Sequence, residues 1–272
     1  MGRIVGKIIS TFSEDSPIVI DPYGKNILSS TAPVFFYENV FNRYFLERLL
    51  GFEPNTRTVH YGYFYRGVFY PVPTEKIFKY YLLKTRGQIV DKPFPTETWF
   101  KVYDVSPMEV FNALEDVFSE RIRKKIVKID VESKEVMLEG GEVLTYQRLF
   151  STIPAPVFYR LCGFKKNFKY RSISFEVEDR PKGFYDTSFD YIYYPGDEPF
   201  YRIYHNRFNG VFVHEYIGNF GENVVRYGKI LPPYGVYVNY FRMKDVFFIG
   251  RHALWQEEYY IHDGVRDCLK IL

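Results

Sequence analysis

Two stretches of the sequence hold residue types that could do chemistry. In the first, an arginine lies within a run of tyrosines that alternate along expected strands; the members are Tyr191, Tyr193, Tyr194, Tyr201, Arg202 and Tyr204. If they share one face of a sheet, they can line a pocket for a polar or planar substrate. A half-buried sheet in an aromatic-rich protein explains the same pattern without a ligand, so both interpretations stay open.

The second stretch closes the chain. Val246–Ile249 is apolar, Gly250 and Arg251 follow it, and a helical pattern runs from about Ile261 to Leu272. A glycine directly after a strand lets a ligand approach the backbone closely. The first turn of the expected helix offers free N–H groups to an anionic or electron-rich group. An ordinary terminal strand–helix unit fits the same residues.

Other catalytic centres have no motif in this chain. The five histidines include no i, i+4 pair and no HExxH, which argues against a metal site. No GxSxG elbow, GxxxxGK[ST] loop or intact GxGxxG occurs. Cys162 and Cys268 are too far apart for a CxxC site. From the residues alone, no catalytic residue can be assigned.

Composition limits the class of protein. The 272 residues carry 36 Lys+Arg and 33 Asp+Glu, a net charge of +3, which argues against binding nucleic acid through phosphate neutralisation. With 46% hydrophobic residues, the chain can bury a core as one large domain or two joined ones. The sequence shows no secretory signal and no apolar run of about 20 residues. We therefore expect a cytoplasmic protein without a membrane span.

Aromatic residues are unusually frequent, with 26 Tyr and 27 Phe beside only 2 Cys and 4 Met. The shortage of thermolabile side chains suggests a source in a hot environment.

The pattern of elements predicts a fold of the α/β or α+β class with a large antiparallel middle portion. Ile4–Ile9 and Pro17–Ile20 look like short strands, and Asp21–Gly24 looks like a turn. Helical spacing follows within 33–50, 75–84 and 106–118, with a hairpin at 59–72. A β-meander at 125–139, a strand at 149–153 and a strand-rich region at 170–241 complete the prediction, before the terminal strand and helix.

Several blocks carry a resemblance, in the order in which they occur. They are Met1-Gly2-Arg3 with Val19–Gly24, Tyr65–Pro71, Val127–Asp130 with Tyr146–Pro154, Tyr193–Ile203, and Phe248–Trp255. Together they resemble the flavin-dependent amine-oxidase and protoporphyrinogen-oxidase superfamily, particularly its UDP-galactopyranose-mutase-like branch. No single block is decisive, but their collinear order over the whole chain makes the resemblance fairly specific.

The resemblance implies FAD as cofactor and a small-molecule substrate. It implies an incomplete FAD/NAD(P)-binding Rossmann-like domain from residues 1–30, 119–163 and 242–272, with a mostly antiparallel substrate domain from 31–118 and 164–241. The cofactor-binding residues would be Gly2, Arg3, Val127, Gly250, Arg251, Trp255, Ile261 and His262. The substrate would meet Tyr70, Tyr194, Arg202 and Tyr234, and no metal is expected.

The sequence also departs from that family. The GxGxxG unit is absent, and the chain starts just after the place where that unit would end. Gln147 and Gly235 replace an expected aspartate and proline. Three explanations stay open: a partner chain that carries the unit, a longer natural chain, or a remnant that serves as a non-catalytic scaffold. An uncovered sheet would favour pairing with that partner or with a second copy.

Overall fold

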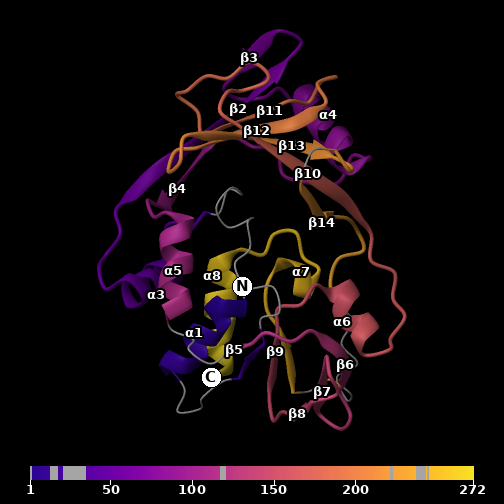
Figure 1. The fold of residues 1–272 in the computed structure, drawn as a ribbon. Helices are drawn as coiled ribbons and strands as arrows, with labels where there is room; N and C mark the ends of the chain where they lie inside the picture. Colours follow the sequence, from indigo (N-terminus) through magenta and orange to yellow (C-terminus); the bar gives the residue numbers. More distant parts are fainter. Residues whose placement is uncertain are drawn as a thin grey trace.

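The computed structural model describes residues 2–12, 18–20, 35–116, 121–220, 223–236, 243 and 245–272. The fold is mixed α/β, with one large sheet in the upper part and helices with short strands in the lower part (Figure 1). The fold class predicted from the sequence is therefore confirmed. None of the helices described is long and apolar enough to cross a lipid bilayer.

The large sheet has eight strands. In spatial order they are β14 (Asn223–Ile230), β10 (Tyr170–Glu178), β13 (Val211–Ile217), β12 (Phe200–Asn206), β11 (Tyr191–Tyr193), β2 (Thr56–Tyr65) and β3 (Val68–Tyr70), with β4 (Trp99–Tyr103) also paired to β2. All of these pairs are antiparallel except β11 with β2, which is parallel. The sheet thus brings strands from both halves of the chain together.

Local signals set the ends of the elements around this sheet. The predicted hairpin is confirmed: Arg66 and Gly67 both have positive φ, 51° and 80°, as a tight two-residue turn requires. Helix α4 (Glu75–Arg86) begins where Thr74 Oγ1 accepts a hydrogen bond from the Ile77 N–H. It ends at Gly87, whose left-handed φ of 75° suits glycine.

The lower part has two halves. One is a group of helices, α1 (Gly2–Phe12), α3 (Val40–Leu50), α5 (Pro107–Asp116) and α8 (Ile261–Ile271), which share one apolar core. The other holds the predicted meander, β6 (Ile126–Asp130), β7 (Glu135–Leu138) and β8 (Val143–Thr145), with α6 (Ala155–Leu161) and α7 (Arg251–Leu254). Two parallel pairs complete it: β1 (Val19–Ile20) with β5 (Arg121–Ile122), and β9 (Leu149–Ser151) with β15 (Val246–Phe248).

The predicted strand at Ile4–Ile9 is wrong, because these residues lie in helix α1. Val5, Ile8 and Ile9 are buried in the core shared with α3, α5 and α8. Their spacing of three and four residues puts them on one helical face, and burial of that face outweighs the strand preference of β-branched side chains. The predicted turn at Asp21–Gly24 lies outside the described residues.

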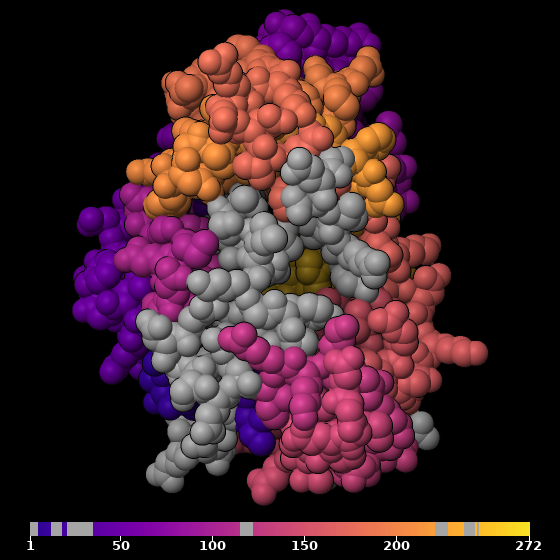
Figure 2. All heavy atoms as spheres, viewed as in Figure 1, coloured from indigo at the N-terminus to yellow at the C-terminus, as the bar shows by residue number. Residues whose placement is uncertain are grey.

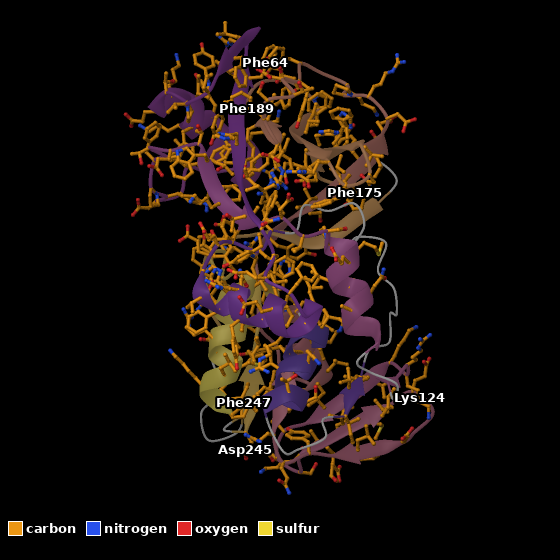
Figure 3. The ribbon with its side chains drawn as sticks, turned by 90° about the vertical axis from the view of Figure 1, so that its left-hand side faces the viewer. Phe64, Lys124, Phe175, Phe189, Asp245 and Phe247 are labelled. Atoms are coloured by element: carbon orange, nitrogen blue, oxygen red, sulfur yellow. The ribbon has the colours of Figure 1, made fainter. Side chains whose placement is uncertain are left out.

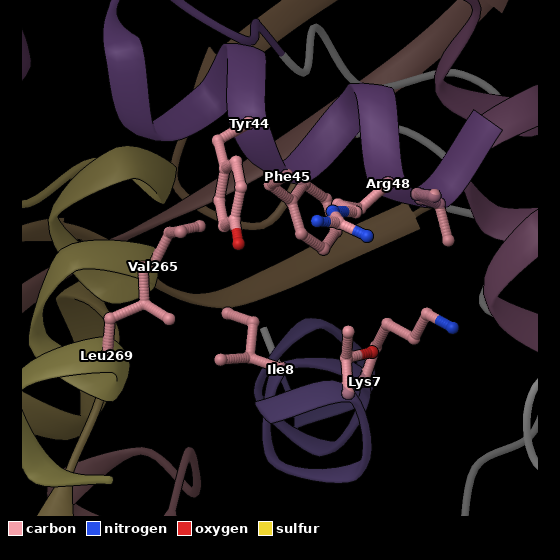
Figure 4. Close-up of a pocket in the computed structure, with 9 residues that line it drawn as sticks. Lys7, Ile8, Tyr44, Phe45, Arg48, Val265 and Leu269 are labelled. Carbon is pink, nitrogen blue, oxygen red and sulfur yellow. The ribbon is translucent and has the colours of Figure 1, made fainter. Parts of the chain in front are cut away.

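Helices α3 and α5 pack with α1 and α8, although they fall in the segment that we assigned to the substrate domain. The domain boundaries stay a prediction. Where α1, α3 and α8 meet, Ile8, Phe45 and Val265 line a small hollow with Lys7 and Arg48 at its edge (Figure 4). The hollow is apolar inside, as expected at a crossing of three helices.

The close packing of the sheet can be tested by a substitution at Gly228 on β14. A Cβ at this position would lie 1.8 Å from Ile173 Cγ1 on β10, so the strands have no room for a side chain there. We expect Gly228→Ala to lower the free energy of unfolding by about 2 kcal/mol, measured by urea denaturation. Thr145→Ala on the exposed face of β8 is the control, with an effect below about 0.5 kcal/mol. Equal effects of the two substitutions would contradict this packing.

Candidate functional site

The sheet and the lower part meet in a layer that holds the candidate site. Figure 3 shows the two parts joined end to end. On the face drawn in Figure 2, atoms in the yellow of the C-terminal segment are visible between the two parts. The layer is built from the sheet, the end of α4 and the residues from Gly250 to His262.

Tyrosines cover the sheet face at this layer. The parallel pairing of β11 with β2 puts Tyr191 beside Tyr61, and Tyr193 beside Tyr63. The Tyr61 and Tyr191 rings stack at 5.3 Å with 4° between their planes, and the Tyr63 and Tyr193 rings are 5.1 Å apart. The guanidinium of Arg202 lies 5.4 Å from the centre of the Tyr191 ring. The structure therefore brings Arg202 and these tyrosines together.

Arg202 already has a carboxylate partner. Its Nη2 lies 2.5 Å from Glu215 Oε1 on β13, its Nε donates to Oε2 at 3.1 Å, and the Tyr201 hydroxyl donates to the same carboxylate. Burial raises the pKa of Glu215, but the charge and hydrogen bonds of Arg202 outweigh it, so the pKa lies below its usual value. Arg202 is thus part of a neutralised pair, which weakens its attraction for an anionic group of a substrate.

The other predicted substrate residues are dispersed. The Tyr194 hydroxyl donates to the Phe184 carbonyl, and its ring packs on Phe200 in a different apolar cluster. Tyr70 packs at the edge of the cluster under α4. Tyr234 is 44% exposed, and the N–H of the next residue, Gly235, donates to the carbonyl of Trp255 at 2.9 Å. Of these three tyrosines, Tyr234 is thus the one tied to the C-terminal segment.

Five of the predicted cofactor residues lie together because they are close in sequence: Gly250, Arg251, Trp255, Ile261 and His262. Gly250 has φ of 108°, which disfavours any side chain, and it lies two residues after the end of β15. Ligands of parallel sheets bind beyond the carboxyl ends of the strands, where Gly250 lies. Val127 lies on β6 of the meander and is 50% exposed. Gly2 and Arg3 begin α1, and their side chains are outside the described part.

Ser151 ends the strand that pairs with β15, so it is next to Gly250 in space. Ser151 is paired in register with Phe248, and the Ser151 carbonyl accepts a hydrogen bond from the Ile249 N–H at 3.0 Å. The Ser151 hydroxyl is buried and has no hydrogen-bond partner among the described residues. Because an unpaired buried hydroxyl is costly, this atom is a candidate ligand contact.

The first turn of α8 carries an aromatic group. Tyr260 packs on Tyr37 at 5.0 Å between ring centres and stacks on His262 at 5.7 Å. Burial raises the pKa of Tyr37 above its usual value, so its hydroxyl stays protonated and can donate a hydrogen bond. The Asp263 carboxylate accepts a hydrogen bond from the Tyr260 N–H at 2.8 Å. The first hydrogen bond within the helix runs from the Gly264 N–H to the Tyr260 carbonyl. The N–H groups of Ile261 and His262 come before it in the chain and are therefore not used by the helix itself.

Arg251 lies over the Tyr260 ring, with its guanidinium carbon 5.7 Å from the ring centre. Burial lowers its pKa, and the nearby charges of Arg202 and Arg86 add to this effect. No carboxylate of the described chain is within ion-pair distance of Arg251. A cation that is partly buried without a partner favours an anionic ligand.

Sequence reasoning missed four charged residues of this layer. Arg86 of α4 pairs with Glu257, and Lys92 lies 3.3 Å from the same carboxylate. Lys229 of β14 lies near Arg202, Glu215, Arg86 and Lys92. No local motif marks these side chains, because they come from a helix end, a loop and a strand that only the tertiary fold brings together.

Comparisons with known proteins agree with the fold. No protein-family model matches the sequence, and no curated protein sequence matches it. A structure of reduced UDP-galactopyranose mutase superposes on 99% of this chain and 91% of its own, with a TM-score of 0.65 and 12% identity. A structure of a CLA-producing fatty acid isomerase from P. acnes superposes on 99% of this chain and 95% of its own, with a TM-score of 0.58 and 9% identity.

A flavin-dependent halogenase from Xanthomonas campestris also superposes, over 99% of this chain and 67% of its own, with a TM-score of 0.51 and 12% identity. The chain has a flavoprotein-like fold. At these identities the likeness extends to the fold and not to the reaction.

The pair of Arg202 and Glu215 predicts a pH-dependent stability. We expect Glu215→Gln to lower the free energy of unfolding by about 3 kcal/mol at pH 7, because it leaves Arg202 buried without a countercharge. The folded pKa of Glu215 lies below the unfolded value of 4.5, so its contribution is present above pH 4.5 and is lost as the pH falls further. The difference between the variant and the wild type should therefore shrink below that pH in urea denaturation.

The control is Glu142→Gln, which breaks the exposed pair with Lys124. It should change the free energy of unfolding by less than about 1 kcal/mol at either pH. A constant difference between Glu215→Gln and the wild type from pH 7 to pH 3 would contradict the role assigned to the pair.

Proposed function

We propose that the chain binds FAD in the layer between the sheet and the C-terminal segment, and that it is an FAD-dependent oxidoreductase-like protein of the amine-oxidase or UDP-galactopyranose-mutase type. The observation that carries this proposal is the arrangement of Ser151, Gly250 and Arg251 at the carboxyl ends of β9 and β15. The flavoprotein-like fold supports the same location.

The residues present fit such a cofactor. Gly250 leaves the backbone open. Among the residues described, the buried Ser151 hydroxyl has no hydrogen-bond partner and the Arg251 cation has no carboxylate partner. The N–H groups of Ile261 and His262 suit an electron-rich group. A bound flavin would supply two-electron chemistry, while the chain supplies orientation and charge. This division of labour is consistent with a sequence that lacks a catalytic triad or metal motif.

The part of the proposed site that would bind the FAD pyrophosphate lacks its usual sequence motif. Helix α1 precedes β1 in the chain, and β1 pairs in parallel with β5. A helix followed by a parallel strand is the order found in the second half of a βαβ unit. The sequence holds no GxGxxG loop to bind the pyrophosphate. The proposal therefore includes a partner chain that carries such a unit as the source of full affinity.

A non-catalytic scaffold or interaction subunit is the second candidate. Two groups that a ligand would use are already paired inside the chain. Arg202 is held by Glu215, and the Asp263 carboxylate takes the Tyr260 N–H at the start of α8. A remnant of a flavoprotein that no longer binds its cofactor would have such internal pairs.

The test is FAD binding by the purified protein, followed by visible absorbance after desalting and by fluorescence titration. We expect flavin binding by the wild type and at least tenfold weaker binding by Arg251→Met, equivalent to about 1.4 kcal/mol. The variant should not lower the melting temperature, because it removes a cation without a carboxylate partner. Arg160→Met, on the exposed side of α6, is the matched control and should bind FAD as the wild type does.

Two results would contradict the proposal. A wild-type protein that does not bind FAD, alone or with a partner chain carrying GxGxxG, would favour the scaffold. Equal binding by the wild type and Arg251→Met would place the flavin away from Arg251.

A further inference from the structure

Lys229 is a lysine that the proposed flavin site does not use. It lies near the end of β14, opposite Arg171 of β10, and its side chain is only partly exposed. Its ammonium nitrogen lies 5.1 Å from the centre of the Tyr201 ring. Among the residues that the structure describes, it has no hydrogen-bond or ion-pair partner. An amine in such a place is neither a surface charge nor part of a salt bridge.

Cations surround this amine. Arg202 reaches it from β12, Arg86 from the end of α4 and Lys92 from the following loop. The carboxylate of Glu215 is engaged by Arg202 and by the Tyr201 hydroxyl, and that of Glu257 is shared by Arg86 and Lys92. The three cations therefore outnumber the two largely buried carboxylates with which they pair. Burial lowers the pKa of Lys229 well below its usual value, and the three cations outweigh the effect of Glu215. Burial and the excess of positive charge therefore both disfavour the charged ammonium.

A second lysine shows what a structural role looks like in this protein. Lys84 of α4 is also partly buried, and burial lowers its pKa to about 8. Its ammonium donates to four backbone carbonyls at 2.7–2.9 Å, those of Tyr194, Gly196, Glu198 and Phe200. Lys84 thus holds the loop between β11 and β12. Lys229 makes no such bonds to the described part of the chain, so holding that backbone does not account for it.

A neutral lysine beside cations suits one kind of chemistry. A free amine is a nucleophile toward carbonyl carbon, and neighbouring cations both keep it neutral and attract an anionic group on the substrate. We propose that Lys229 is a nucleophilic amine that captures a small anionic aldehyde or ketone as an imine. Lys229 lies in the same layer as the proposed flavin contacts but is not one of them, and the proposed step does not involve FAD.

The proposed step balances without any other reactant. The nitrogen lone pair of Lys229 attacks the carbonyl carbon and a C–N bond forms. Both protons of the amine move to the carbonyl oxygen, the C–O bond breaks, and one water leaves as the C=N bond forms. No oxidant or reductant is required, and the anionic group of the substrate stays in contact with the surrounding cations.

The experiment uses glyoxylate, a small anionic aldehyde, with cyanoborohydride to reduce the imine to a stable carboxymethyl-lysine. The full chain is treated at pH 7 without added flavin, and the modified lysines are found by peptide mass spectrometry. We expect Lys229 to react at least ten times faster than Lys270, which is exposed on α8, because a solvated lysine carries its charge at neutral pH and a charged ammonium is not a nucleophile. Lys84 should react no faster than Lys270.

Two comparisons separate the parts of the proposal. Glycolaldehyde, a neutral aldehyde, should lose most of the preference for Lys229, because it has no anionic group for the cations to hold. Lys229→Arg keeps the positive charge but cannot form the imine, so the fast-reacting site should disappear while the modification of Lys270 is unchanged.

Clear outcomes would overturn the proposal. Equal rates at Lys229 and Lys270, or no modification of Lys229, would mean that Lys229 is not a nucleophile at neutral pH. The same preference for Lys229 with glycolaldehyde would contradict the anionic substrate. Because no step involves flavin, these results are independent of whether the chain binds FAD.

Discussion

The arrangement of the two parts of the structure depends on the charged side chains that are buried in the layer between them. The side chain of Arg86 is 1% exposed and pairs with Glu257, which joins the helix under the sheet to the segment between α7 and α8. Arg202 and Glu215 form a second pair within the sheet itself. A charge buried without its partner costs several kcal/mol, so these pairs constrain how the sheet sits on the C-terminal segment. The aromatic face around them excludes water and strengthens that constraint.

The same pairs decide which charges remain available for chemistry. Arg86 and Arg202 are neutralised, whereas Arg251 and Lys229 have no carboxylate partner among the residues described. Arg251 lies with Ser151 and Gly250 at the ends of parallel strands, where a cofactor is proposed. Lys229 lies on the sheet side, where a reactive amine is proposed. Both proposed sites thus lie in one layer of the molecule, and each depends on a cation that no carboxylate of the described chain neutralises.

Much of the fold was predictable from local patterns. The hairpin at Arg66-Gly67, the meander and α4 all have strong turn or cap signals, and each is present. The error at Ile4–Ile9 has a physical cause, since a short run of β-branched residues fits a strand or a buried helical face equally well. In the candidate site, the group from Gly250 to His262 was predictable because its members are neighbours in sequence. Arg86 and Lys229 were not, because they are distant in sequence and have no motif.

The sequence by itself determined the local elements, the grouping of tyrosines with Arg202 and the glycine that follows the last strand. These depend on residue periodicity and on backbone preference, which act over a few residues. Only the tertiary structure decided that Glu215 neutralises Arg202 and that Tyr194 lies in another cluster. It also decided that no carboxylate of the described segments pairs with Arg251 or Lys229. Electrostatic pairing depends on distance and burial, and neither can be read from the order of residues along the chain.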